Sequence, residues 1–396
     1  MLSHTSARNV RIAMVIDHLE PGGAQRQFCL LATSLRRIHF QVEVFTLRAD
    51  PFFEYLLDGD PPIYVNHVAT ASRIQLYVRL RRWIRRFRPA AVVSFLSWPN
   101  LLVELCGIPR RSFCVIVSER NIDRSTPGFR RRFRYMTHRL ADAVVSNSYA
   151  QARLITRIDC LLKSRTTVIP NAVDTNYFRP PQRWMTAHSG TINILVLARL
   201  APQKNPLRLI EAVSALRSRR PDLTICVDWY GKLPTSARAS VPRWHQAVNR
   251  RDLVYYQSVK AAISAHSLEE RFRIHGPLVD VRPLYHQSDV LCLPSIFEGY
   301  PNVIAEAMAC GLPVLASAVG DADRLVVHER SGYLFDPLSV RDIIDTIVRF
   351  SELSERDRRK LGAAGRAIAE SLLSVETYTS RYVALIRRLT KNHTKQ

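Results

Sequence analysis

Short apolar runs rich in β-branched residues alternate along this chain with longer amphipathic segments, and this alternation restricts the possible folds more than any other feature. The predicted strands are 10–16, 41–47, 90–95, 113–118, 143–146 and 167–169, followed by 192–197, 223–229, 271–275, 290–293 and 313–316. The predicted helices include 25–37, 76–86, 206–218, 281–287 and 340–351. Strands that alternate with helices favour parallel sheets covered by helices on both faces. We therefore predict an α/β protein with doubly wound sheets.

A polar segment that contains Pro180-Pro181 and Gly190 separates the two series of strands. Such a segment is typical of a linker, because proline and glycine interrupt regular structure. We predict a Rossmann-like domain at 1–178, a linker at 179–190, a second Rossmann-like domain at 191–372, and a helix with a basic tail at 373–396. Ligands of such sheets bind at the carboxyl ends of the strands. A substrate is therefore expected in a central cleft between two facing domains.

The chain is strongly basic, with 57 Lys and Arg against 34 Asp and Glu and a net charge of +23. This balance predicts a polyanionic neighbour, which is a nucleic acid, an anionic membrane surface or a phosphate-rich substrate. The arginines concentrate at 72–89 and 110–139.

The cysteines and the hydropathy pattern bear on the compartment. Seven cysteines are scattered without a C-x-x-C pair, which predicts free thiols in a reducing compartment. No apolar run reaches the roughly 18 residues of a membrane-spanning helix. The first apolar run leads directly into Gly22-Gly23 and is interpreted as a strand rather than a signal peptide. We expect a cytoplasmic protein.

The stretch SIFEGYPNVIAEAMACGLPVLAS (295–317) places Glu298 in a loop and Glu306 one turn inside a helix predicted at 301–310. The first backbone amides of that helix form a candidate anion site; they belong to Asn302, Val303 and Ile304. A carboxylate at Glu306 can accept two hydrogen bonds from ribose hydroxyls, and Glu298 can reach a sugar beyond the phosphates. On spacing alone, an ordinary strand–loop–helix with solvated glutamates remains the alternative.

Two further loops follow predicted strands. In LARLAPQKNPLRLIEAV (197–213), Arg199 and Lys204 lie where two cations would suit a leaving diphosphate. The alternative is two surface cations in a basic protein. In HLEPGGAQRQ (18–27), Gly22-Gly23 would allow a ligand to approach the backbone, although tight turns also need glycine. No G-x-G-x-x-G or Walker A pattern is present.

These segments together resemble the family 4 glycosyltransferases, also called glycosyl transferases group 1, which have the GT-B fold. The matching pieces are the Gly-Gly loop, VIPNAVDTNYF (168–178), LARLAPQKNP (197–206), the segment 271–317 and SGYLFDP (331–337). The resemblance implies catalytic roles for Glu298, Arg199 and Lys204. The donor-binding residues that it implies are Gly23, Arg199, Lys204, Glu298, Gly299, Asn302, Val303, Ile304 and Glu306. It also implies retention of anomeric configuration without a metal or other cofactor, the nucleotide sugar being a substrate.

One position departs from the family. Many relatives carry a histidine near the reacting sugar, whereas this chain has FLSWPN (95–100) and SERN (118–121), with no nearby histidine as an obvious substitute. We predict that Arg120 and Asn121 contact donor or acceptor; a low-activity member is the alternative. GDADRL (320–325) contains D-x-D, a metal motif of a different transferase fold, and Asp321 and Asp323 are interpreted as loop and helix-cap residues. The twelve histidines show no metal-ligand spacing.

The segment 76–87 predicts an amphipathic helix with one apolar face that includes Trp83, and arginines elsewhere. Such a helix suits an anionic membrane surface. A helix packed on the core with arginines toward solvent is the alternative, and the two are compatible. The basic segment 129–139 would extend the patch or bind acceptor phosphates.

The combined prediction is a retaining, metal-independent glycosyltransferase that moves a hexose or N-acetylhexosamine from a UDP-sugar. Its acceptor would be a lipid-linked or polysaccharide glycan in cell-surface glycan biosynthesis, with peripheral association at the cytoplasmic face of the membrane. A sugar-nucleotide epimerase on the same architecture is the alternative. A basic nucleic-acid-binding protein is less favoured, because no nucleic-acid-binding motif is present.

Overall fold

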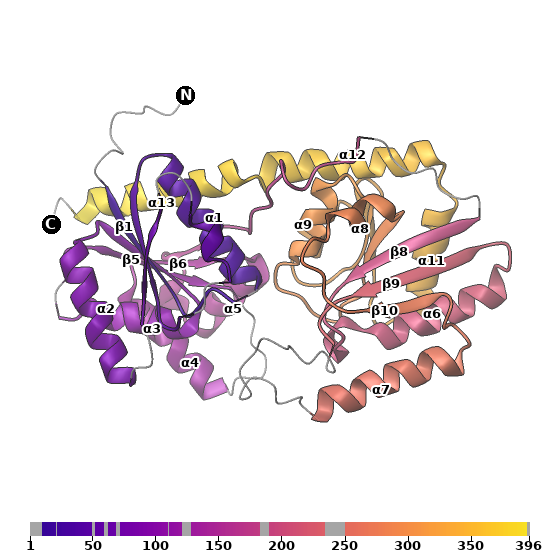
Figure 1. Ribbon diagram of the computed structural model, residues 1–396, viewed down its shortest axis with the longest axis horizontal. Coiled ribbons are helices and arrows are strands. Elements are labelled where there is room, and N and C mark those ends of the chain that lie inside the picture. The colour runs from indigo at the N-terminus through magenta and orange to yellow at the C-terminus, as the bar shows by residue number, and fades with distance from the viewer. Residues whose placement is uncertain are drawn as a thin grey trace. The chain divides into compact units, whose positions relative to one another are not determined.

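The computed structural model describes residues 10–20, 22–49, 52–58, 62–68, 72–109, 111–120, 128–182, 190–233 and 250–393. The chain forms two compact units (Figure 1). Unit 1 consists of Met1–Ala172 together with Leu373–Gln396, and unit 2 is Val173–Leu372. The chain therefore passes between the units twice, and the C-terminal segment returns to unit 1.

Unit 1 is built on a seven-stranded parallel sheet with the order β3-β2-β1-β4-β5-β6-β7. Its strands are β1 (Arg11–Ile16), β2 (Gln41–Thr46), β3 (Tyr64–His67), β4 (Ala91–Phe95), β5 (Cys114–Glu119), β6 (Ala143–Ser146) and β7 (Thr166–Val168). The central strands are buried on both faces, as parallel sheets covered by helices require. Alternate residues of β1 enter two different cores: Met14 joins one and Val15 the other.

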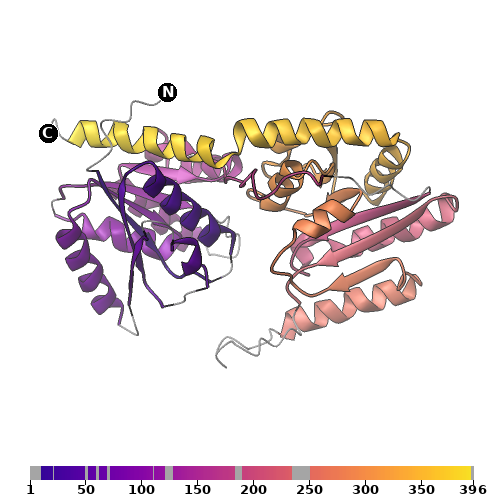
Figure 2. The same cartoon turned by 45° about the horizontal axis from the view of Figure 1, so that its top comes forward.

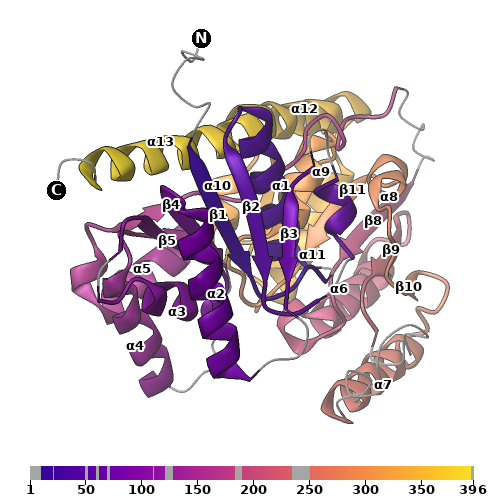
Figure 3. The ribbon, with the colours of Figure 1, turned by 60° about the vertical axis from the view of Figure 1, so that its left-hand side comes forward.

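Helices cover both faces of the unit 1 sheet. The described helices are α1 (Gly23–Arg37), α2 (Arg73–Phe87), α3 (Ser97–Cys106), α4 (Gly128–Thr137), α5 (Tyr149–Ile158) and α13 (Val375–His393), with short 3₁₀ turns η1 (Glu54–Leu56), η2 (His138–Leu140) and η3 (Cys160–Leu162). Helices α1 and α13 pack on one face, where Tyr378, Tyr382 and Ile386 of α13 are buried in the core (Figure 2). Helices α2, α3, α4 and α5 contribute to the core of the opposite face (Figure 3).

Unit 2 contains a six-stranded parallel sheet with the order β10-β9-β8-β11-β12-β13. Its strands are β8 (Thr191–Leu197), β9 (Thr224–Tyr230), β10 (Phe272–His275), β11 (Val290–Leu293), β12 (Val314–Ser317) and β13 (Gly332–Phe335). Its helices are α6 (Pro206–Arg219), α7 (Arg250–Ala265), α8 (Arg282–Gln287), α9 (Asn302–Ala309), α10 (Ala322–Leu325), α11 (Val340–Ser351) and α12 (Glu355–Leu372), with the 3₁₀ turn η4 (Pro202–Lys204). Helices α6, α7 and α11 share one core with β8 and β9, and α9 packs against α12.

The predicted α/β class with two parallel, doubly wound sheets is confirmed. Two strands, β3 and β13, were absent from the sequence prediction. The first is half-exposed at the sheet edge, and the second begins at a glycine, so neither forms a long apolar run. All seven cysteines are free, although Cys160 is exposed. Among the described helices, none combines the length and apolar character needed to span a membrane.

Candidate active site

In unit 2, the sheet changes winding direction between β8 and β11, which are neighbours in space but lie far apart in the sequence. Ligands of open α/β sheets bind outside the carboxyl ends of the strands at such a switch point. The loop after β8 leads to Arg199 and Lys204, and the loop after β11 carries Glu298 and Gly299. The fold thus brings the two predicted loops to one edge.

The side chains of Lys204 and Glu298 meet directly. The Lys204 ammonium donates a hydrogen bond to Glu298 Oε1, and the two side chains are only 16% and 11% exposed. Lys204 ends the turn η4, which begins at a proline, and Asn205 follows in the left-handed conformation. The partly buried pair brings a cation and a carboxylate together in the loops that follow β8 and β11.

Gln203, which the sequence analysis did not select, connects the two loops. The side-chain amide of Gln203 donates to the carbonyl of Phe297 at 2.8 Å, and the backbone carbonyl of Gln203 accepts from the Ile296 amide at 2.8 Å. A third loop also contacts this segment, because a Cβ added at Gly320 would collide with the carbonyl oxygen of Glu298. Gly320 has φ +65°, a conformation that glycine adopts without strain. The loop that carries Glu298 is therefore bonded to Gln203 through Ile296 and Phe297 and is closely approached by Gly320 at Glu298 itself.

Helix α9 begins at Asn302, one residue later than predicted, and the Pro301 that precedes it supplies no side-chain cap. The Ile304 amide donates to the Pro301 carbonyl at 3.1 Å, so it is engaged within the first turn. Asn302 and Val303 are half-buried at the start of the helix. This end of α9, which begins four residues after Glu298, is the positive end of the helix dipole.

Glu306 is hydrogen-bonded to Tyr285, a second residue that the sequence analysis missed. The Tyr285 hydroxyl donates to Glu306 Oε2 at 2.8 Å. The Tyr285 ring is completely buried and contacts the ring of Phe178 edge-on, with 6.0 Å between centroids. Because the tyrosine is fixed by packing, it fixes one oxygen of the carboxylate. No spacing rule reveals this contact, since 21 residues separate the partners.

Two other predicted positions in unit 2 are also described. Arg199 lies between β8 and η4 with an exposed side chain, and it forms no salt bridge with another described residue. Asp321 occupies the position before α10, although no side-chain capping bond is present, and Asp323 lies within its first turn. Within the described part of the chain, no group of three or more potential ligand side chains could hold a metal ion.

In unit 1, Gly23 is exposed and opens α1 after β1, as predicted. Asn121 lies outside the described residues. Arg120 is buried, and its guanidinium donates to Asn171 Oδ1 at 2.7 Å and to the hydroxyls of Tyr378 and Tyr382 at 3.0 and 2.6 Å. It also lies 4.1 Å from the ring centroid of Phe95. A contact with an acceptor would require the guanidinium to leave these partners, and its present contacts hold α13 on the sheet.

A histidine does lie beside the departure from the family pattern. His138 is completely buried, and its ring nitrogens are 2.6 Å from Glu104 Oε1 and 3.2 Å from Glu119 Oε1. Burial alone would lower the pKa of His138, but the hydrogen bonds and charges of the two glutamates raise it to about 9. Arg134, at 3.6 Å from Glu119, adds a second cation. This cluster joins α3, β5, α4 and η2, and it was not found from the sequence because its members are far apart.

The basic helix predicted at 76–87 is present as α2, and its apolar face lies in the core. Leu80, Trp83 and Ile84 are buried, and Trp83 Nε1 donates to Glu43 Oε2 at 3.0 Å. The arginines at 79, 82, 85 and 86 are exposed. The tryptophan is therefore a core residue, and the arginine side of α2 faces outward.

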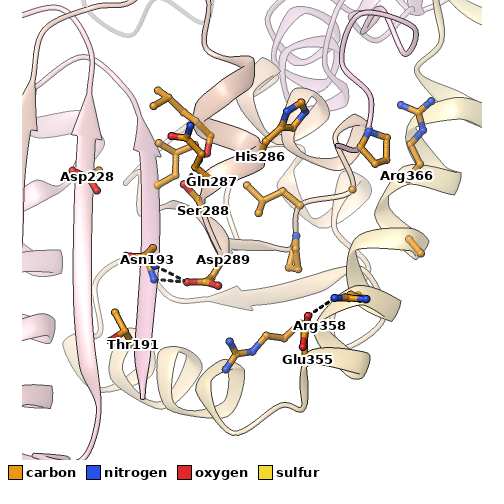
Figure 4. A pocket seen from close by; sticks show the side chains of 18 of the residues that line it. Thr191, Asn193, Asp228, His286, Gln287, Ser288, Asp289, Glu355, Arg358 and Arg366 are labelled. Atoms are coloured by element: carbon orange, nitrogen blue, oxygen red, sulfur yellow. Dashed lines mark hydrogen bonds and ion pairs between the residues drawn. The ribbon is translucent and has the colours of Figure 1, made fainter. Parts of the chain in front are cut away.

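A cavity of about 740 Å³ lies elsewhere in unit 2. Figure 4 shows Asn193 directed toward Asp289, with Glu355, Arg358 and Arg366 on α12 at the other wall. Asn193 donates to Asp289 at 2.7 Å from its backbone and at 3.1 Å from its side chain. None of the predicted donor residues lines this cavity.

Comparisons with known proteins agree with the fold and with the motifs. The family model described as "Glycosyl transferases group 1" matches residues 181–368, and "Glycosyltransferase Family 4" matches residues 21–177. The chain is 24% identical over 375 residues to D-inositol 3-phosphate glycosyltransferase of Pseudarthrobacter chlorophenolicus, covering 85% of each protein. It is 28% identical over 198 residues to the Escherichia coli UDP-Gal:alpha-D-GlcNAc-diphosphoundecaprenol alpha-1,3-galactosyltransferase, covering 48% of this chain and 46% of that protein.

A solved structure extends the likeness to the whole architecture. Anabaena Alr3699/HepE in complex with UDP superposes with a TM-score of 0.76 at 20% identity, and the match covers 96% of this chain and 100% of that one. At this identity the match concerns the fold, which is GT-B. The two family models follow one another along the chain and together match both units. The chain therefore belongs to the family 4, group 1 glycosyltransferases and is a transferase enzyme with the GT-B fold.

Proposed function

We propose that this enzyme transfers a hexosyl or N-acetylhexosaminyl group from a UDP-sugar to a glycan acceptor, with retention of configuration and without a metal ion. The observation that carries the proposal is the meeting of Lys204 and Glu298 beside the start of α9, with Glu306 fixed by Tyr285. HepE, which shares the fold, was solved with UDP, and the E. coli relative is named for a UDP-Gal donor. Both names support a uridine nucleotide as the donor.

In the proposed reaction, the acceptor hydroxyl attacks the anomeric carbon on the face from which UDP departs. The bond from the anomeric carbon to the phosphate oxygen breaks, the new glycosidic bond forms, and a phosphate oxygen of the leaving UDP takes the acceptor proton. Lys204, Arg199 and the amide groups at the start of α9 stabilise the charge that develops on the diphosphate. Glu298 would hold hydroxyls of the transferred sugar, Glu306 the ribose, and Gly23 would let the diphosphate approach the backbone.

The acceptor is proposed to be a lipid-linked or polysaccharide glycan, and the enzyme is proposed to bind the cytoplasmic face of the membrane. The E. coli relative is named for an acceptor on diphosphoundecaprenol. The exposed arginines of α2 and the net charge of +23 provide electrostatic attraction to anionic headgroups.

Substituting Glu306 with alanine should abolish the rise in melting temperature that the correct UDP-sugar gives to the wild type. Ligand stabilisation depends on affinity through mass action, and the variant would lack the acceptor of the ribose hydroxyl hydrogen bonds. Glu298→Ala should instead lower turnover more than nucleotide binding. The matched control is Glu211→Ala on the exposed side of α6. If Glu306→Ala responds to UDP-sugars as the wild type does, the proposed donor site is wrong.

Substituting Tyr285 with phenylalanine should weaken UDP binding about fivefold. One hydrogen bond to a charged group is worth roughly 1.5–3 kcal/mol, and only part of it should be lost here because Tyr285 contacts Glu306 and not the ligand. The ring would keep its packing on Phe178. Isothermal titration with UDP and with 2′-deoxy-UDP provides the decisive comparison. The loss should shrink with the deoxy ligand, because Tyr285 acts on the ribose through Glu306. Equal losses with both ligands would assign Tyr285 a purely structural role; Tyr255→Phe on α7 is the control.

A further inference from the structure

Helix α4 exposes an apolar stripe to solvent. Phe129, Phe133 and Met136 are 72%, 63% and 44% exposed, and Leu140 in the following turn η2 is also exposed. Their spacing of four, three and four residues places them on one side of a helix. An isolated exposed apolar residue needs no explanation, whereas a row of large ones marks an interaction surface.

The opposite side of α4 is firmly attached to unit 1. Tyr135 is completely buried in the core, and Arg134 donates to Ser97 Oγ of α3 at 2.9 Å. His138, one turn further on, is buried between Glu104 and Glu119. The helix therefore already has a core-facing side, and the phenylalanines are on the other. Among the described residues of unit 1, the core contacts of α4 are therefore made by the side opposite the stripe.

The charge around the stripe has one sign. Residues 128–140 contain five arginines and no aspartate or glutamate, and Arg130 and Arg132 are exposed beside the phenylalanines. Helix α3 contacts both α2 and α4 (Figure 3). At the start of α2, Arg73 stacks over Trp98 of α3 at 5.5 Å, and the adjacent Ile74 is 76% exposed. Two helices that flank the start of α3 thus present exposed apolar residues together with arginines.

We propose that α4 inserts Phe129, Phe133 and Met136 into an anionic lipid bilayer, while Arg130 and Arg132 bind the headgroup phosphates. A row of apolar side chains bordered by arginines matches the boundary between acyl chains and anionic headgroups. A second copy of the chain would bring the same arginines face to face, and like charges oppose such a contact. A nucleic acid would engage the arginines but leave the phenylalanines in water. This membrane contact extends the proposed function, and its biological purpose rests on that function. The observations that support the contact itself all come from unit 1.

The test uses the full chain and sedimentation with vesicles of phosphatidylcholine and phosphatidylglycerol at low and high salt. Phe129→Ser/Phe133→Ser should reduce the bound fraction at least about tenfold, since each phenylalanine would lose its apolar transfer into the bilayer. Arg130→Glu/Arg132→Glu should reduce binding by a similar factor at low salt and weaken its salt dependence, because the exposed arginines of α2 remain. Tyr64→Ser/Val254→Ser, which removes two other exposed apolar side chains, should bind like the wild type. All variants should keep the wild-type melting temperature within a few degrees, because the substituted positions are exposed.

Wild-type binding by the phenylalanine variant would overturn the proposal, as would an equal loss in the Tyr64/Val254 control. Binding that responds to the arginines alone would also overturn it, because it would mean adsorption without insertion. A wild-type dimer in analytical ultracentrifugation that the phenylalanine substitutions dissociate would assign the stripe to a copy–copy contact instead. UDP binding is also measured without vesicles, in the wild type and in each variant. If the wild type binds UDP but does not bind vesicles, the proposed membrane contact is wrong and the proposed donor site is unaffected.

Discussion

Replacing Lys204 with alanine should lower kcat by about 10²–10³-fold, the loss typical of removing one group that stabilises developing charge. Lys204 lies beyond the carboxyl ends of the strands at the switch point, and its hydrogen bond to Glu298 holds it in place. The charge that leaves with UDP is greatest in the transition state, so kcat should fall more than the affinity for UDP. Release of UDP in the presence of acceptor measures the rate, and EDTA in every assay keeps divalent metal ions from contributing.

Lys260→Ala, which removes an exposed lysine of α7, is the matched control and should leave kcat unchanged. Lys204→Arg keeps the charge and should retain part of the rate. The assignment would fail if Lys204→Ala turned over at the wild-type rate. A loss confined to the affinity for UDP would also count against it, because it would mean that Lys204 binds ground state and transition state equally.

Replacing His138 with leucine should destabilise unit 1 by about 3–5 kcal/mol, because it leaves Glu104 and Glu119 buried without their shared cation. For a unit of this size that corresponds to a fall in melting temperature of roughly 10 °C. Thermal unfolding by circular dichroism measures it. His67→Leu, which removes a partly exposed histidine beside Glu54, should cost about 1 kcal/mol or less.

The same cluster predicts a dependence on alkaline pH. The pKa of His138 is raised from its ordinary value of 6.5 to about 9 by its glutamate partners, despite the opposing effect of burial. Its contribution to stability is therefore complete below pH 6.5 and is lost as the pH rises through about 9. The melting temperature of the wild type should fall across this interval, and that of the leucine variant should fall less. Glu104→Gln serves if the leucine variant does not fold, and an identical pH profile in wild type and variant would exclude the assigned role.

The sheets could be predicted from sequence because their strands are short runs of buried β-branched residues. Strand β6 and helix α11 have the predicted bounds. Strand β3 was not predicted, because its residues are half-exposed at the edge of the sheet, where burial imposes no apolar pattern. The predicted break at 372/373 coincides with one division between the compact units, whereas the polar stretch suggested a linker at 179–190 and the units divide at Ala172/Val173. Composition can indicate a linker, but it does not indicate that α13 packs on unit 1.

The candidate site was predictable in its chemistry and not in its connections. Glu298 and Lys204 were selected separately, from two segments 94 residues apart, and the structure joins them. Gln203 and Tyr285 act through contacts with a carbonyl and a carboxylate that no local pattern encodes. The partners of the Arg120 guanidinium were also not predictable from local sequence, because they lie as many as 262 residues away, near the end of the chain.

The attachment of α13 to unit 1 limits how the enzyme can be dissected. Tyr378, Tyr382 and Ile386 of α13 belong to a core whose members outside α13 come from the first 172 residues. A fragment cut after Ala172 would leave the Arg120 guanidinium without its two hydroxyl acceptors and would expose the apolar surface that α13 covers. To fold on its own, unit 1 would need residues 373–396 joined to residues 1–172 by an engineered linker. Unit 2, in contrast, is the single continuous segment 173–372 and can be expressed directly.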